Sequence, residues 1–152
     1  MTEEPTPVEQ RFLNTVLRRL RSGGKMIAGT FCEALVADAL PGSVESDLGI
    51  AAWDLDWESH KIEVKATTVG RWNVSARSLR NGTKQRARQA DVYILASHDG
   101  DDLSSGWEFY VVPTGVLNER GKNSITLSGA RGLATPVALE ELPAAVRAAA
   151  RP

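Results

Sequence analysis

The chain has 152 residues, of which 42% are hydrophobic and 24% charged, with a formal net charge of -1, which is the composition of a soluble globular protein. Its single cysteine, Cys32, excludes an internal disulfide framework, and the absence of an apolar run of about 18 residues excludes a membrane span. Together with an acidic, proline-containing N-terminus unlike a secretory signal, these features predict a cytoplasmic protein with one domain over residues 1–152.

The N-terminal part of the sequence predicts two helices after a loose tail at residues 1–8. Apolar side chains recur at the helical spacing between residues 8 and 23, and this segment ends in two glycines. A second helix is expected over about residues 28–40, because the chain then meets Pro41. This second helix carries Glu33 near its start.

The remainder of the chain predicts a sheet with helices packed against it. Strands are expected over about residues 50–57, 61–68, 72–76, 91–97, 107–113 and 124–128. Further helices are expected over residues 82–89, from Pro113 toward Asn118, and in the C-terminal segment 139–150, with Pro143 near its first turn. This order indicates an α/β or α+β domain with a mixed central β-sheet flanked by helices.

The segment KIEVKATT, residues 61–68, combines a buried strand face with a charged one. Side chains alternate across a strand, so Ile62 and Val64 read as buried, whereas Glu63 and Lys65 share the opposite face. An acid and a base are costly to desolvate at the middle of a sheet. Their presence there therefore favours a functional role, and the alternative is an exposed ion pair on a solvated face.

Two more carboxylates precede this strand. Asp54 and Asp56 share one face of the expected strand 50–57. A tight two-residue loop would place Asp54 opposite Glu63, whereas a four-residue loop would place Asp56 opposite Glu63 and Asp54 opposite Lys65. Either register gathers all four side chains on one face. Close carboxylates repel each other unless a cation lies between them, and oxygen ligands favour Mg²⁺ or Mn²⁺.

Charge is distributed unevenly around this hairpin. From Gln10 to Cys32 there are five basic residues and no acidic one; from Glu33 to Glu63 there are eight acidic residues and one lysine; from Val64 to Ala90 there are seven basic residues and no acidic one. A phosphate-backbone binder with an acidic, metal-holding centre would need this pattern. The alternative is that the charge blocks are solvated surface.

An acid followed about nine residues later by E-x-K resembles the active site of the PD-(D/E)XK nuclease superfamily. AGTFCEALVADAL resembles the first core helix of that superfamily, and IEVKATTVGRW, ADVYILASH and WEFYVVPTGVL resemble small bacterial restriction-endonuclease-like proteins. The likeness spans roughly residues 26 to 130. Trp53 stands where the family motif has proline. Both Asp54 and Asp56 remain candidates, and WDL before a short turn resembles the family pattern better with Asp54.

The resemblance implies a metal-dependent DNA endonuclease that leaves a 5′-phosphate and a 3′-hydroxyl. It implies that Asp54, Glu63 and the Val64 carbonyl coordinate Mg²⁺ or Mn²⁺, and that Lys65 positions the attacking water. It also implies that Glu33 orients the metal ligands through water or binds a second metal. Gln85 occupies a place where many such nucleases carry an active-site residue. The alternative is a catalytically inactive nuclease-fold protein that binds DNA or serves as an accessory protein.

The basic segment after the hairpin is the candidate DNA-binding surface, with polar and aromatic side chains between its cations. Its expected contacts are Arg71, Trp72, Arg77, Arg80, Lys84, Arg86 and Arg88. The alternative for Trp72 is a place in the core, and for Gln85 an ordinary helix surface. One site cuts one strand, so duplex cleavage would need a homodimer. The apolar stripe of the first helix is a candidate interface, although such a stripe more often packs in the core.

Overall fold

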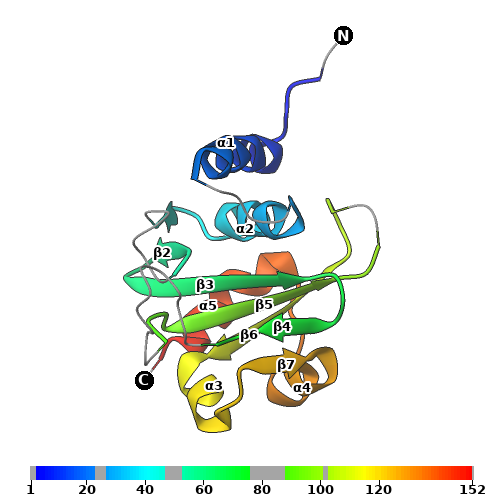
Figure 1. Cartoon of the computed structure of the whole chain (residues 1–152). Helices are drawn as coiled ribbons and strands as arrows, with labels where there is room; N and C mark the ends of the chain where they lie inside the picture. The colour runs from blue at the N-terminus through cyan, green and yellow to red at the C-terminus, as the bar shows by residue number, and fades with distance from the viewer. Residues whose placement is uncertain (1–2, 23–26, 47–52, 76–87, 101–102, 152) are drawn as a thin grey trace.

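A computed structural model of the chain describes residues 3–22, 27–46, 53–75, 88–100 and 103–151. Within these ranges the chain is a mixed α/β protein, which confirms the predicted class (Figure 1). No helix in the described ranges is both long enough and apolar enough to cross a membrane.

Within the described residues, two helices are followed by six strands, and helices and one further strand complete the chain. In order, they are α1 (Pro7–Ser22), α2 (Ile27–Ala39), β1 (Val44–Glu45), β2 (Leu55–Trp57), β3 (His60–Thr67), β4 (Arg71–Asn73), β5 (Val92–His98), β6 (Trp107–Pro113), α3 (Thr114–Arg120), β7 (Ser124–Thr126), α4 (Leu127–Leu133), the 3₁₀ helix η2 (Leu139–Glu141) and α5 (Leu142–Ala149). Proline stands in the first turn of α5, where its missing N–H costs nothing.

Five strands form a mixed sheet in the order β1-β2-β3-β5-β6. β3 and β5 run parallel, whereas the other neighbouring pairs are antiparallel. β4 leaves this sheet and pairs with β7 in a separate two-stranded ribbon. The parallel neighbours β3 and β5 are therefore joined by a crossover that includes β4, and they form the centre of the molecule.

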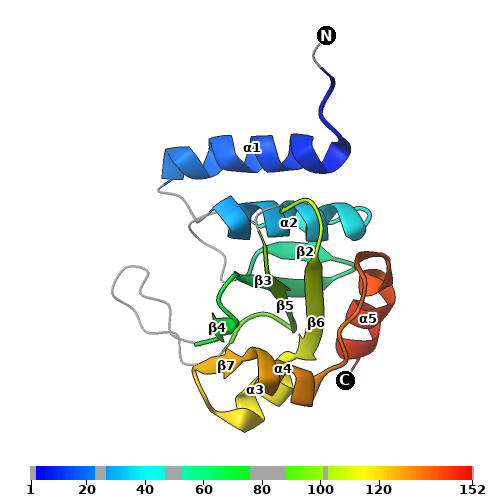
Figure 2. The ribbon, with the colours of Figure 1, turned by 90° about the vertical axis from the view of Figure 1, so that its right-hand side faces the viewer.

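Both faces of the central strand β5 are covered. Ile94 and Ala96 belong to a core that includes residues of α2 and α5, whereas Tyr93 and Leu95 belong to a second core that includes residues of β4, β7, α3 and α4. This is why VYILA reads as a continuous apolar run instead of an alternating one. Figure 2 shows α2 on one side of the sheet and the β4–β7 ribbon with α3 and α4 on the other.

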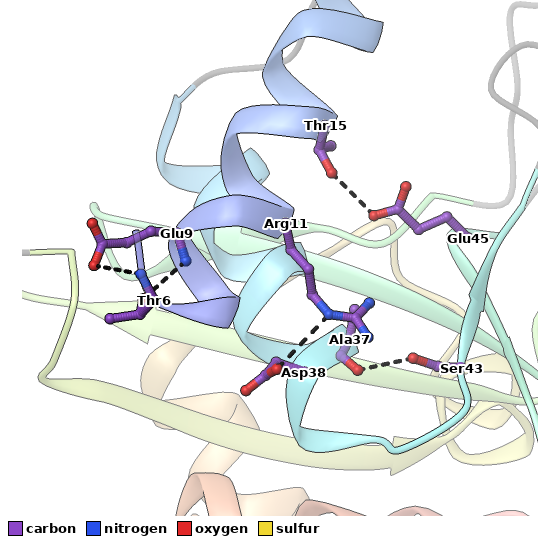
Figure 3. A network of polar contacts seen from close by, with 8 residues as sticks. All are labelled: Thr6, Glu9, Arg11, Thr15, Ala37, Asp38, Ser43 and Glu45. Carbon is purple, nitrogen blue, oxygen red and sulfur yellow. Dashed lines mark hydrogen bonds and ion pairs between the residues drawn. The ribbon is translucent and has the colours of Figure 1, made fainter. Parts of the chain in front are cut away.

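The helix α1 lies on the outer side of α2 and not on the sheet (Figures 1 and 2). The rings of Phe12 and Phe31 lie 5.0 Å apart between the two helices. Thr15 donates a hydrogen bond of 3.0 Å to Glu45, as Figure 3 shows. Leu13 and Leu17 are 45% and 55% exposed. The apolar stripe of α1 is thus only partly used by α2, and the homodimer stays a prediction.

Several predicted elements differ from the structure. Within the described residues, the strand predicted over 50–57 begins at Leu55. The helix predicted over 82–89 is not seen at Arg88 and Gln89, and its other residues lie outside the described ranges. The strand predicted over 124–128 ends earlier because Thr126 caps α4, accepting a hydrogen bond from the Gly129 N–H. β1 and α4 were not predicted.

Candidate active site

A two-residue turn sets the register of the candidate hairpin. Glu58 and Ser59 both adopt left-handed backbone, with φ of 49° and 66°, the conformation that tight hairpin turns require. Leu55 then pairs with Ile62, and Trp57 pairs with His60. Continuing this antiparallel register by one residue places Asp54 opposite Glu63, which is the arrangement expected for the shorter loop. The four-residue loop is excluded.

Asp54 is attached to the middle of β3 by two hydrogen bonds. Its backbone N–H donates to the Ile62 carbonyl at 2.9 Å, and its Oδ2 accepts from the Val64 N–H at 2.8 Å. The N–H and C=O of one strand residue face the same edge, so the Val64 carbonyl faces the edge where Asp54 lies. A carboxylate and a backbone carbonyl therefore meet at this edge of β3.

Asp56 has different surroundings. It is exposed, it pairs with Lys61, and its Oδ1 accepts a hydrogen bond of 3.1 Å from the Trp53 indole. The Lys61 ammonium lies 4.6 Å from the centre of the same indole ring. Asp56 thus belongs to a surface group near the hairpin turn, whereas Asp54 reaches the backbone beside Glu63.

Glu63 lies beside a buried tyrosine that the sequence did not single out. In the parallel pairing of β3 and β5, Glu63 is opposite Tyr93, which is 4% exposed. The pKa of Tyr93 is raised to about 12, first by burial and then by the negative charges of Glu63 and Asp54, while Arg88 opposes the rise. The negative charges of Glu63 and Asp54 thus both reach the Tyr93 phenol, which supports the view that the two carboxylates lie near each other. Tyr93 can be recognised as a neighbour of Glu63 only from the register of β3 and β5, which are distant in sequence.

Glu33 and Lys65 line one cavity of about 380 Å³ together with Val64. The Trp57 indole donates a hydrogen bond of 2.8 Å to the Pro41 carbonyl, which places the end of α2 near the start of β3. The two elements therefore run in opposite directions, and Glu33, although 5% exposed, meets the middle of β3. The cavity thus brings a buried carboxylate from α2 to the backbone of β3 at Val64 and Lys65.

The donor atoms at this edge are all oxygen. Asp54, Glu63 and the Val64 carbonyl fit Mg²⁺ or Mn²⁺, because Mg²⁺ is commonly held by one or two carboxylates, with water or substrate phosphate completing its shell. Within the described ranges, no three side chains of the His, Cys, Asp and Glu types gather closely enough to form a metal-binding group. Glu33 and the Asp54–Glu63 pair therefore do not form one such group.

Trp72 lies in the core, and its predicted role as a DNA-stacking residue is wrong. It is 2% exposed, its indole N–H donates to the Ala96 carbonyl at 3.0 Å, and its ring packs edge-on against Tyr110 at 6.2 Å. It pairs with Ile125 of β7, so the β4–β7 ribbon turns it toward the second core. A buried indole with its donor satisfied has no face to offer a base.

Arg88 is engaged inside the protein. Its guanidinium donates to the Val74 carbonyl at 2.9 Å, the Asn118 side chain at 2.7 Å and the Lys122 carbonyl at 3.4 Å. These bonds join three segments, which gives Arg88 a structural role, and its predicted contact with phosphate stays a prediction. Arg71 on β4 is exposed. The other predicted contacts, Arg77, Arg80, Lys84, Gln85 and Arg86, lie outside the described ranges.

The sequence matches no protein-family model, and a search of curated proteins finds no match. The candidate site is therefore argued from its own residues: the Asp54–Val64 contact, the Glu63–Tyr93 pair and the cavity shared by Glu33 and Lys65.

Proposed function

We propose that this protein is a Mg²⁺- or Mn²⁺-dependent DNA endonuclease of the PD-(D/E)XK type, with a restriction-endonuclease-like arrangement of its sheet and helices. The observation that carries the proposal is the hydrogen bond from the Val64 N–H to the Asp54 carboxylate. It holds an acidic side chain at the β3 edge, beside Glu63 and the Val64 carbonyl. Restriction-endonuclease-like sites use this combination of oxygen donors.

In this proposal the metal is held by Asp54, Glu63 and the Val64 carbonyl. When bound, the metal supplies positive charge that polarises the scissile phosphate. The hydrogen bond from Val64 restrains the Asp54 side chain, so little conformational entropy remains to be lost when the site is used. Tyr93 lies opposite Glu63 and restricts the space on that side.

In this proposal Lys65 of β3 and Glu33 of α2 act on the substrate around the middle of β3. The Lys65 ammonium orients the attacking water and stabilises negative charge on the phosphate in the transition state. Glu33 enters from α2 into the cavity that Lys65 lines, where it orients water near the metal. The expected reaction is phosphodiester hydrolysis to a 5′-phosphate and a 3′-hydroxyl.

The DNA-binding surface in this proposal begins at the exposed Arg71 and continues into the basic segment 77–86. Small polar residues and cations in this segment suit contacts to phosphate oxygens. One site cuts one strand, so duplex cleavage requires two copies acting together. The exposed Leu13 and Leu17 of α1 are a candidate contact between copies.

The proposal is tested by cleavage of supercoiled plasmid, linear duplex and single-stranded DNA with Mg²⁺, Mn²⁺ or EDTA. Wild type is compared with Lys65→Ala and Glu63→Ala. We expect cleavage that needs the metal and falls by about 100-fold or more in both variants.

The contradicting outcome would be DNA that is bound in a salt-sensitive way but not cut under any metal condition. That result favours the alternative, a nuclease-fold protein without catalysis that binds DNA or serves as an accessory factor. Circular dichroism of each variant checks that its fold is retained, so that lost activity is not confused with unfolding.

A further inference from the structure

The two faces of β3 carry side chains of different kinds. Val64 belongs to the core that α2 helps to form, so its neighbours Glu63 and Lys65 point to the opposite face of the sheet. On that face the parallel pairing of β3 and β5 places Tyr93 directly beside Glu63. A tyrosine is therefore the cross-strand neighbour of the glutamate that is proposed to bind the metal.

The Tyr93 side chain is enclosed by the protein. It is 4% exposed, and the antiparallel pairing of β5 with β6 places Val112 on its other side. Val112 is fully buried and has no polar side-chain atom. A buried hydroxyl is nearly always hydrogen-bonded, so the Tyr93 hydroxyl needs polar partners. In the row of side chains formed by Val112, Tyr93 and Glu63, the polar neighbour is the Glu63 carboxylate.

Arg88 contacts the phenol from another direction. Burial raises the pKa of Tyr93 most, and the charge of Glu63 raises it as well, whereas a hydrogen bond from the Arg88 guanidinium lowers it. A guanidinium only donates hydrogen bonds, so the phenol oxygen is the acceptor in this contact and its own O–H is directed elsewhere. The Arg88 guanidinium is itself held by hydrogen bonds to the Val74 carbonyl and the Asn118 side chain. A restrained guanidinium therefore fixes the phenol oxygen beside the carboxylate.

We infer that Tyr93 is a positioning residue for the proposed metal site, and that its O–H donates a hydrogen bond to the Glu63 carboxylate and orients it toward the edge where Asp54 lies. The inference rests on the proposed nuclease function and adds an outer partner to its metal site. Carboxylates that bind metals are in turn hydrogen-bonded by such partners, which fix their orientation. In this role Tyr93 touches neither metal nor DNA and acts through Glu63.

A second tyrosine provides a matched control. Tyr110 of β6 is 0% exposed, and its hydroxyl donates to Glu108 at 2.6 Å and accepts from Arg131 at 3.3 Å. The two tyrosines thus share a buried ring, a nearby carboxylate and a guanidinium, but the carboxylate beside Tyr110 is not a proposed metal ligand. Phenylalanine at either position removes one hydroxyl and keeps the ring. Both variants should therefore fold and lose a similar amount of stability, which urea unfolding checks.

Metal binding in the absence of DNA tests the inference directly. Mn²⁺ is titrated into wild type, Tyr93→Phe, Tyr110→Phe and Glu63→Gln, and free Mn²⁺ is measured by electron paramagnetic resonance. We expect Tyr93→Phe to raise the Kd for Mn²⁺ about tenfold and Tyr110→Phe to leave it at the wild-type value. Glu63→Gln, which alters the ligand itself, should weaken binding at least as much as Tyr93→Phe. An unchanged Kd in Tyr93→Phe, or an equal rise in both phenylalanine variants, would overturn the inference.

The metal dependence of cleavage gives a second readout, which a purely structural role of Tyr93 would not move. The rate of plasmid nicking is measured against the concentration of Mn²⁺. In Tyr93→Phe the half-saturating concentration should rise about tenfold, while the rate at saturating metal should stay within about threefold of wild type, because Glu63 is still present. A lower rate at saturating metal with an unchanged half-saturating concentration would contradict the positioning role.

The two measurements separate this inference from the nuclease proposal. Mn²⁺ binding that is weakened in Glu63→Gln but not in Tyr93→Phe overturns the inference and leaves the nuclease proposal standing. Mn²⁺ binding that Tyr93→Phe weakens, without cleavage of any DNA, supports the role of Tyr93 and overturns the nuclease reaction alone. A wild-type protein that binds no Mn²⁺ overturns both.

Discussion

The carboxylate of Asp54 accepts a hydrogen bond from the backbone N–H of Val64 at 2.8 Å. This contact joins the residue just before β2 to the middle of β3 and separates Asp54 from Asp56, which faces Lys61 and Trp53 instead. The two aspartates lie close together in sequence, yet only Asp54 is seen at the edge toward which the Val64 carbonyl points. The chemistry proposed for the site depends on this difference.

Two arginines of the basic region should respond differently to substitution. Arg71→Ala is expected to weaken DNA binding and to lower the slope of log affinity against log salt by about 1, because it removes one exposed cation. Arg88→Ala is expected to lower the free energy of unfolding by about 2 kcal/mol, because it removes internal hydrogen bonds from a charged donor. Fluorescence anisotropy and urea unfolding measure the two effects. Weaker DNA binding by Arg88→Ala at unchanged stability would contradict the structural role.

Trp72 should affect folding and not DNA affinity. Trp72→Ala is expected to cost about 3–5 kcal/mol of unfolding free energy, because it empties a large buried site. Trp72→Phe retains most of the packing but loses the hydrogen bond to Ala96, at a cost of about 1 kcal/mol. Urea unfolding gives both values. The affinity of Trp72→Phe for DNA should equal that of wild type; a clear loss would restore the stacking role that burial argues against.

Tyr93 should make stability depend on pH in the alkaline range. Burial and the charges of Glu63 and Asp54 raise the pKa of Tyr93 in the folded state to about 12. The stabilisation of the fold that results is therefore fully present below the ordinary tyrosine pKa of 10.0. That contribution is lost as pH rises through about 12. Phenolate absorbance should show a late-ionising tyrosine that Tyr93→Phe removes. Ionisation of Tyr93 near its ordinary pKa would contradict its placement beside the two carboxylates.

The hairpin turn should lose one contact in acid. Arg147 donates two hydrogen bonds of 2.8 Å to Glu58. These bonds are the largest cause of the lowered pKa of Glu58. A lowered pKa means that the ion pair stabilises the fold above the ordinary value of 4.5 and is lost as pH falls through the lower folded value. The unfolding midpoints of wild type and Arg147→Gln should therefore converge in acid. A constant difference at every pH would show that Arg147 acts by packing on Trp57 alone.

Local periodicity was enough to predict much of the fold. The helices α1, α2 and α5 follow from apolar spacing and from glycine and proline at their ends, and the alternation in β3 predicts that Ile62 and Val64 are buried while Glu63 faces away. These features depend on neighbours within one element. They can therefore be read without knowing what packs against them.

Features that depend on residues distant in sequence could not be predicted from local patterns. The hairpin register stayed open because Glu58–Ser59 lacks the Asn-Gly or Asp-Gly signal of a two-residue turn. Trp72 fits either face of a strand until its pairing with Ile125 is known. Tyr93 meets Glu63 only through a parallel pairing, whose register no local pattern sets.

The most direct test of the candidate site compares Asp54→Asn with Asp56→Asn in metal-dependent nicking of supercoiled plasmid. Both variants remove one negative charge at nearly constant volume, so they differ mainly in place. We expect Asp54→Asn to reduce the nicking rate about 100-fold and Asp56→Asn to change it by less than about twofold. Equal rates for the two variants, or a loss confined to Asp56→Asn, would contradict the site at the Asp54–Val64 contact.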